Sequence, residues 1–335
     1  MLPLVSIIVP CYNEQATIRS LLEAINAQTY PRSCLEVIIA DGLSEDDTRV
    51  EIASFRHEHS DLCLCIVDNP GHIIPIGLNR AIRGARGEII IRMDAHSKPY
   101  PDYVERCVQA LEAGLGKNVG GVWEIRPGGE GWIAEAIAVA AAHPLGVGDA
   151  LYRHAKHPAQ VDTVPFGAFY RSLVDHIGMY NETLLTNEDY EFNTRVRRSG
   201  GRVWLDPEIR SVYFARVNLN ELARQYWRYG FWKWCMLRRY PSTLRWRQAL
   251  PPLFVISLFI LVVLAFWLPV MRTLLFLEIF LYLAMLFSVG LHAAVHQRKV
   301  HLILGLPLAI STMHFSWGSG FLCSLIFGSR AGKNG

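Results

Sequence analysis

The chain has 335 residues, of which 51% are hydrophobic, and a formal net charge of +3 at pH 7. Domains usually contain about 100 to 200 residues, so this length predicts one large domain and a smaller part. The small net charge gives no support for nucleic acid binding. The seven cysteines lack the paired spacing of a disulfide framework or a zinc site, so we expect them to be reduced packing residues.

Charged residues are unevenly distributed along the chain. Residues 249–271 and 300–329 contain no Asp, Glu, Lys or Arg, whereas charges are frequent up to Arg247. Such stretches predict membrane segments that follow a soluble domain. The first residues show no basic region followed by an apolar one, so we expect no signal peptide and a domain that stays in the cytosol. We therefore expect three parts: residues 1–217, 218–249 and 250–329.

In the N-terminal part, short runs rich in Val, Ile and Leu alternate with longer amphipathic runs, which predicts βαβ units. We expect strands at 5–10, 35–40, 62–67 and 88–93, with helices at 16–28, 45–55 and 75–85 between them. In an open parallel sheet, ligands bind at the carboxyl ends of the strands. The candidate binding loops are therefore those that follow the four strands: 11–14, 41–47, 68–72 and 94–98.

The rest of the soluble part is less regular. We expect strands at 119–125 and 163–170, and helices at 132–142, 187–198 and 218–237. The fold class that follows is α/β, with an open, mostly parallel sheet flanked by helices and with C-terminal transmembrane helices.

Polar residues follow the first two predicted strands. The first strand ends in Pro10-Cys11-Tyr12-Asn13-Glu14, and the second ends in Asp41-Gly42-Leu43-Ser44-Glu45-Asp46-Asp47. A carboxylate just past a strand can accept hydrogen bonds from a nucleobase or from ribose hydroxyls, and Tyr12 offers an aromatic face for a base. The alternative is structural, because Asp-Gly is a common turn and Ser44 is a good helix N-cap.

The fourth predicted strand is followed by Asp94-Ala95-His96. An oxygen ligand and an imidazole two residues apart can share a divalent ion, which would neutralise a departing pyrophosphate. The structural alternatives are a turn-capping Asp94 and a surface His96. The position after a parallel strand favours a metal-binding role for Asp94 more than for His96.

Acidic residues open the helix expected at 187–198. Acidic side chains in a first helical turn interact favourably with the helix dipole, which is a sufficient structural explanation. One of these carboxylates could also accept a proton from a hydroxyl group as a general base.

Taken together and in this order, six segments resemble the inverting family 2 glycosyltransferases, over roughly residues 3–240. The segments are PCYNE, DGLSEDD, MDAH, Gly167-Ala-Phe-Tyr-Arg171, Asn187-Glu-Asp189 and Gln225-Tyr-Trp-Arg228-Tyr229. Within this family the chain looks most similar to the bacterial glucosyltransferases of succinoglycan and exopolysaccharide assembly. The resemblance implies a fold of the GT-A type.

The resemblance implies a donor site and a metal site. The residues implied to hold the nucleoside are Pro10, Tyr12, Glu14 and Asp41. Asp94, with His96 in second place, is implied to bind the Mn²⁺ or Mg²⁺ that bridges the donor diphosphate. The family usually has Asp-x-Asp at this point, so His96 puts the metal preference in doubt.

The resemblance also implies the catalytic and acceptor residues. Asp189 matches the general base, and Glu188 matches a residue near the acceptor. Gln225, Arg228 and Tyr229 match the Gln-x-x-Arg-Trp motif, in which the arginine meets the diphosphate and the aromatic residue borders the acceptor. Tyr229 replaces the usual Trp, so the acceptor platform can differ.

The region 218–249 mixes basic and aromatic residues, which is typical of a helix at the level of lipid headgroups. Nucleic acid binding is the alternative, but membrane segments follow directly. We expect spans at 253–270 and 273–295, with the flanking basic residues on the cytoplasmic side. A third segment, 302–327, contains glycines and a proline that predict a broken helix, which either crosses once or enters and returns.

From these features we expect an enzyme that moves a hexose, glucose being one candidate, from a UDP-sugar to a polyprenyl-diphosphate-linked saccharide. We place it in the bacterial inner membrane as a multi-pass protein with a cytoplasmic catalytic domain, in contact with lipid and with other polysaccharide-assembly enzymes. The alternatives are a synthase that glycosylates a polyprenyl phosphate directly and, outside enzymes, a membrane scaffold with a degenerate nucleotide-binding domain. The acidic positions named above argue against degeneracy.

Overall fold

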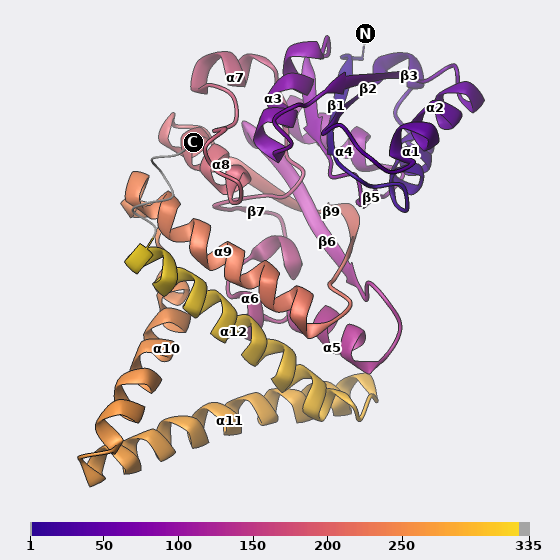
Figure 1. The fold of residues 1–335 in the computed structure, drawn as a ribbon. Coiled ribbons are helices and arrows are strands. Elements are labelled where there is room, and N and C mark those ends of the chain that lie inside the picture. Colours follow the sequence, from indigo (N-terminus) through magenta and orange to yellow (C-terminus); the bar gives the residue numbers. More distant parts are fainter. Residues whose placement is uncertain (1, 328–335) are drawn as a thin grey trace. The chain divides into compact units, whose positions relative to one another are not determined.

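The computed structural model describes residues 2–327, which form two compact units (Figure 1). The first unit contains the chain up to Glu124 together with Leu151–Tyr213, and the second contains Ile125–Ala150 and the chain from Phe214 onward. By contacts alone, residues 125–150 therefore group with the C-terminal part of the chain. The division into 1–217, 218–249 and 250–329 stays a prediction, and residues 328 and 329 lie outside the described part.

The described residues form a nine-stranded mixed sheet, in the order β3-β2-β1-β4-β8-β6-β9-β5 with β7 paired to β9. Its parallel part consists of β1 (Val5–Cys11), β2 (Leu35–Asp41), β3 (Cys63–Asp68) and β4 (Ile89–Arg92). The antiparallel part contains β5 (Lys98–Pro99), β6 (Asn118–Arg126), β7 (Ala159–Gln160), β8 (Ala168–Tyr170) and β9 (Val203–Phe214). The α/β fold class is confirmed, and the parallel pairing is confined to β1–β4.

Helices cover both faces of the sheet, and each face has its own core. On one face lie α1 (Ile18–Asn26), α2 (Thr48–Glu58) and α4 (Tyr103–Glu112). On the other lie α3 (Ile74–Gly84), α7 (Ser172–Ile177) and α8 (Glu188–Arg198). Short 3-10 turns lie at Arg32–Cys34 and Leu151–Arg153.

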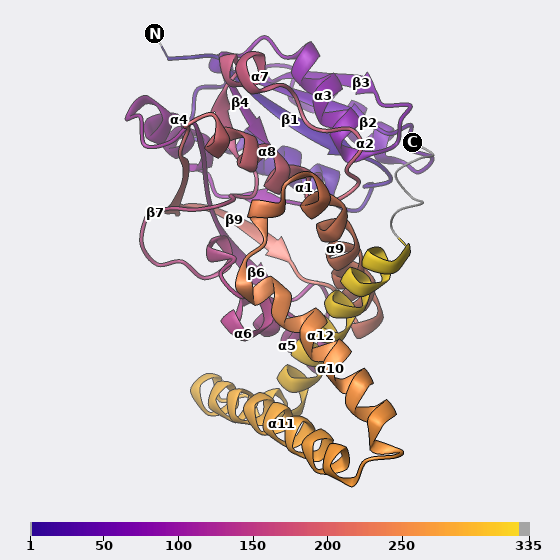
Figure 2. The same cartoon turned by 90° about the vertical axis from the view of Figure 1, so that its left-hand side faces the viewer.

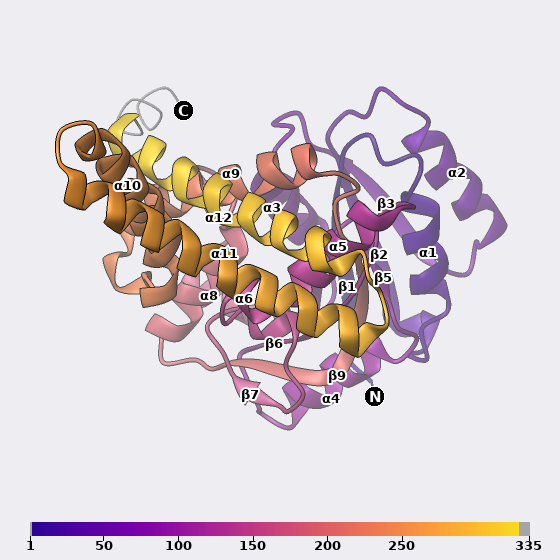
Figure 3. The same ribbon diagram turned by 90° about the horizontal axis from the view of Figure 1, so that it is seen from below.

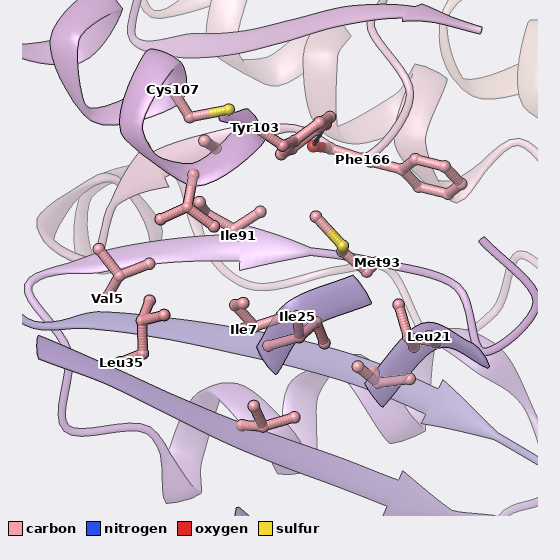
Figure 4. Packing of buried hydrophobic residues seen from close by; sticks show 14 of the residues in the cluster. Val5, Ile7, Leu21, Ile25, Leu35, Ile91, Met93, Tyr103, Cys107 and Phe166 are labelled. Atoms are coloured by element: carbon pink, nitrogen blue, oxygen red, sulfur yellow. Dashed lines mark hydrogen bonds between the residues drawn. The ribbon is translucent and has the colours of Figure 1, made fainter. Parts of the chain in front are cut away.

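Strand β1 shows why the sequences of the parallel strands are continuous apolar runs. Val5 and Ile7 pack into the core with α1 and α4 (Figure 4). Ile8, between Ile7 and Val9, packs into the core on the opposite face. Successive side chains of a strand alternate between faces, so a strand covered on both sides is apolar throughout. Tyr103 is fully buried in the first core, and its hydroxyl donates to the carbonyl oxygen of Phe166 at 2.9 Å.

The second unit is helical. Its elements are α5 (Trp132–Ala142), α6 (Pro144–Val147), α9 (Leu219–Arg239), a 3-10 turn at Pro241–Thr243, α10 (Trp246–Ala265), α11 (Pro269–Gln297) and α12 (Leu302–Phe327). In all three views α12 lies along α9 (Figure 1, Figure 2 and Figure 3).

Glycines allow α9 and α12 to approach closely. A Cβ atom at Gly230 of α9 would lie 2.1 Å from the Trp317 carbonyl oxygen, and one at Gly320 of α12 would lie 2.2 Å from the Trp227 carbonyl oxygen. The predicted break in segment 302–327 is wrong, because α12 is one continuous helix. Pro307 lies inside this helix, where a proline removes one backbone hydrogen bond without ending the helix, and the glycines serve packing.

Among the described residues, two helices are long and apolar enough to cross a membrane: Gln248–Ala265 and Pro269–Gln297. Most of their side chains are exposed, which is expected of helices covered by lipid. The predicted first span, 253–270, is too long at its end, because α10 stops at Ala265 and Pro269 begins α11. α12 is not among these two helices, and much of its surface is buried against α9 and α5. The two apolar helices indicate association with a membrane.

A buried carboxylate joins three segments of the sheet. Glu36 of β2 is 3% exposed and accepts hydrogen bonds from the Ser6 hydroxyl, from the backbone N–H groups of Arg86 and Gly87, and from the Arg86 side chain. Burial alone would raise the pKa of Glu36, but the bonds from Ser6 and Arg86 outweigh it and hold the pKa below its usual range.

We expect Glu36→Gln to destabilise the protein by about 1–3 kcal/mol, because a neutral amide cannot accept all of these hydrogen bonds. Since the folded-state pKa is lowered, the contribution of Glu36 is present above its unfolded pKa and is lost as the pH falls through the folded one. Thermal unfolding of the two proteins in detergent at neutral and at acidic pH measures both effects. A difference in Tm that stays constant down to the lowest pH would contradict the role of the ionised carboxylate.

Candidate functional site

The parallel register brings the ends of three strands into line. Cys11 of β1 pairs with Asp41 of β2, and Asp41 pairs with Asp68 of β3. Asp41 is fully buried, and it accepts from the Ser44 hydroxyl at 2.6 Å and from Arg49 Nε at 2.5 Å. Arg49 also pairs with Asp68 at 2.5 Å. The carboxylate predicted to bind a nucleoside is therefore held firmly, in a row with a second, exposed carboxylate.

The first two binding loops are tied to each other. The backbone N–H of Asn13 donates to the Ser44 hydroxyl at 2.9 Å, and the Asn13 side chain accepts from the backbone N–H of Glu45 at 2.9 Å. Asn13 has a positive φ of 53°, which asparagine tolerates better than most residues. The loops after β1 and β2 therefore form one structure.

Tyr12 presents an aromatic surface beside these carboxylates. Its side chain is 45% exposed, and its ring meets the His72 ring edge-on at 5.9 Å between centroids. A Cβ atom at Gly42 would lie 3.1 Å from the Tyr12 ring, so glycine leaves room for it. Pro10 is buried within β1 and is not exposed beside Tyr12.

Glu14 and His96 lie together. His96 Nδ1 is 3.0 Å from Glu14 Oε1, and the Thr17 hydroxyl also donates to Glu14. The structure thus joins two residues that the sequence assigned to different tasks, Glu14 to the nucleoside and His96 to the metal. The imidazole faces a carboxylate from the loop after β1.

A buried arginine brings the other acidic residues together. Arg92, the last residue of β4, is 4% exposed. Its guanidinium lies 3.0 Å from Asp94 Oδ1 and 3.0 Å from Glu188 Oε1, and it also pairs with Asp189. Sequence reasoning named the three carboxylates and missed the arginine between them. The available signal was a single charge at the end of an otherwise apolar strand, Ile89–Arg92.

Two features fix the first turns of α8, the helix that carries Glu188 and Asp189: the residue before the helix and a ring contact made by one of its residues. Asn187 takes the left-handed conformation, with φ of 69°, and α8 begins at the next residue. Phe192 of α8 stacks on Tyr180 with 4.7 Å between ring centroids. Glu188 and Asp189 therefore have a defined direction toward Arg92.

The charges around Arg92 do not balance, because three carboxylates face one guanidinium. Desolvation raises the pKa of Asp189, Arg92 lowers it, and the neighbouring Glu188 and Asp94 raise it further, to about 7. The Asp189 side chain keeps 29% of its surface exposed, so a ligand can reach it. A carboxylate that titrates near neutral pH is suited to accept a proton from a hydroxyl group.

The described residues contain no group of three or more His, Cys, Asp or Glu side chains arranged to hold a metal ion by themselves. Mg²⁺ is nevertheless commonly bound through one or two carboxylates together with substrate phosphates. Asp94 is 25% exposed and belongs to a cluster with excess negative charge. The oxygen donors and the charge of this cluster fit a divalent cation that is shared with a diphosphate.

Gln225, Arg228 and Tyr229 belong to α9, in the second unit. Gln225 Nε2 donates to the Tyr229 hydroxyl at 2.9 Å, which links two residues of the predicted motif across one helical turn. The role of these three residues in the site stays a prediction.

Comparisons with known proteins identify the family. The model of glycosyl transferase family 2 matches residues 6–178, more than half of the chain. The succinoglycan biosynthesis protein ExoA of Rhizobium meliloti is 29% identical over 96% of this chain and 94% of its own length. A dolichyl N-acetyl-α-D-glucosaminyl phosphate 3-β-D-2,3-diacetamido-2,3-dideoxy-β-D-glucuronosyltransferase of Methanococcus voltae is 26% identical over 98% of this chain and 99% of its own.

A solved structure agrees in fold. The mannosyltransferase PcManGT of Pyrobaculum calidifontis, solved with GDP-Man and Mn²⁺, superposes with a TM-score of 0.61 at 22% identity, over 97% of this chain and 88% of its own. The fold is thus of the type found in the GT-A transferases, as the sequence predicted. The family match, the two full-length relatives and the shared fold lead to one conclusion, that this chain is a glycosyltransferase of family 2.

Proposed function

We propose that the protein transfers a hexose from a UDP-sugar to a polyprenyl-linked saccharide, with inversion at the anomeric carbon. The observation that carries this proposal is the cluster of Asp94, Glu188 and Asp189 around Arg92. One end of this cluster follows β4, where a donor diphosphate is expected, and the other opens α8. The relatives support the acceptor class, since one is named for succinoglycan biosynthesis and the name of the other includes a dolichyl phosphate-linked sugar.

The donor occupies the ends of β1 and β2 in this proposal. Tyr12 contacts the base with Glu14 beside it. Pro10 and Asp41 are buried, so Asp41 supports this site through Ser44 and Arg49 and does not meet the nucleoside itself. Asp94, with His96 as the weaker candidate, would hold Mn²⁺ or Mg²⁺. The bound cation would neutralise charge on the departing nucleoside diphosphate.

The protein's own groups carry out the proton transfer. The acceptor hydroxyl is a weak nucleophile at neutral pH, so Asp189 takes its proton as the new glycosidic bond forms. Glu188 lies near the acceptor, and Arg228 stabilises the negative charge of the leaving diphosphate. Gln225 and Tyr229 border the acceptor. The product is a lipid-linked saccharide that is longer by one hexose.

We propose that α10 and α11 span the bacterial inner membrane as a hairpin and hold the catalytic unit on its cytoplasmic face. Basic and aromatic residues of α9 then contact lipid headgroups. Other polysaccharide-assembly enzymes are the further partners in this proposal.

We expect Asp189→Asn to lower the rate of hexose transfer by about 10²- to 10⁴-fold, because an amide cannot act as a base. Binding of UDP with Mn²⁺ should fall far less, by several-fold at most. The matched control is Glu191→Gln, which removes a negative charge from the same helical turn at a residue paired with Arg195. Equal losses of transfer in the two variants, measured with labelled UDP-glucose and purified membranes, would leave only the helix-dipole explanation.

The rate of transfer should rise with pH through the region near 7. Asp189 accepts a proton only when it is ionised, and its raised pKa keeps it largely protonated in more acidic solution. Rates at saturating donor and acceptor, measured from about pH 5.5 to about pH 8.5, test this expectation. A rate that falls across this range would exclude Asp189 as the base.

The protein should remain in the membrane fraction after washing with concentrated salt. Salt screens charge contacts but does not weaken the burial of apolar helices such as α10 and α11. Detergent should release the protein and serves as the control. Complete extraction by salt alone would show that the two helices do not span.

A further inference from the structure

Arg92 lies between the proposed metal ligand and the proposed base, and none of the roles above includes it. We propose that Arg92 is a positioning residue that competes with the divalent cation for Asp94 and thereby links cation binding to its hold on Asp189. This inference rests on the proposed function, because it assigns Asp94 to the cation and Asp189 to the acceptor.

The guanidinium meets its three carboxylate neighbours with different atoms. Nη2 and Nε lie 3.0 Å and 3.3 Å from Asp94 Oδ1. Nη1 lies 3.0 Å from Glu188 Oε1 and also contacts Asp189 Oδ1. One side of a rigid, planar group therefore faces the cation ligand, and the other side faces the base.

Arg92 stays positively charged, and water does not solvate that charge. Arginine stays protonated in proteins, and this side chain is 4% exposed, so it depends on its carboxylate partners rather than on water. A cation that binds Asp94 either displaces the guanidinium from Oδ1 or binds beside it. In both cases the positive charge of Arg92 opposes cation binding.

Displacement from Asp94 also changes the other side of the guanidinium. Once Asp94 is bound to the cation, Arg92 retains only Glu188 and Asp189 as partners. The guanidinium then interacts more strongly with these two carboxylates, because Asp94 no longer competes for it. Cation binding thus strengthens the hold on Asp189 before the acceptor hydroxyl arrives. Coupling of two sites is reciprocal, so a change at Asp189 must alter the affinity for the cation by the same factor.

The test is Mn²⁺ affinity, measured without turnover by electron paramagnetic resonance on the purified full chain in detergent with UDP present. We expect Arg92→Met to bind Mn²⁺ about tenfold more tightly than the wild type, because a like charge beside the ligand is removed. Hexose transfer should nevertheless fall, with kcat reduced and KM for the donor not raised. The control is Arg106→Met, which removes a charge from a partly buried pair with Asp102. A purely structural role for Arg92 predicts no tighter binding, so unchanged or weaker Mn²⁺ binding in a folded Arg92→Met protein would overturn the inference.

Arg92→Lys provides a second test if the methionine variant does not fold. Lysine keeps the charge, but its single ammonium group cannot contact both sides in the same way. We expect Asp189→Asn to weaken Mn²⁺ binding several-fold in the wild type and by a smaller factor in the Arg92→Lys background. Equal factors in both backgrounds would refute the linkage through Arg92. The Mn²⁺ affinities could change as expected while the wild type transfers no hexose. That outcome would overturn the proposed function and leave the linkage through Arg92 in place.

Discussion

The constraint on which the structure depends is that its parallel strands are covered by helices on both faces. Such a sheet has no solvent-facing side, so a polar group within it must be fully paired or must lie at a strand end. Glu36 meets the first condition through Ser6 and Gly87. Asp41 and Asp68 meet the second. The candidate site residues Asp41 and Asp94 therefore lie where β2 and β4 end.

The same constraint explains the cluster of ion pairs around Arg92. A guanidinium at the end of β4 is too buried to be hydrated, so it attracts Asp94 from its own loop and Asp189 from α8. These segments are far apart in the chain, and the ion pairs bring them together. The remaining negative charge raises the pKa of Asp189 and creates a site that favours a cation. Fold stability and proposed catalysis thus use the same charges.

Much of the first unit could be predicted from the sequence, because strands buried on both faces produce uninterrupted apolar runs such as Val5–Cys11. Strand β9 (Val203–Phe214) was missed, since Pro207 in its middle argues against a strand. The arginine cluster was missed because its members become neighbours only after α8 packs against the sheet. The continuity of α12 was also missed, because Pro307 and the glycines are helix breakers unless a partner helix such as α9 stabilises them.

The close approach of α9 and α12 has a consequence for how the protein is made. The surface of α9 around Gly230 fits the backbone of α12 near Trp317, and α12 is the last helix of the described chain to be synthesised. Until it emerges, α9 lacks the neighbour that covers its apolar face. The helix that carries Arg228 therefore reaches its final environment only after both apolar helices, α10 and α11, have been synthesised. The packing of α9 against α12 is thus complete only once both apolar helices have been made.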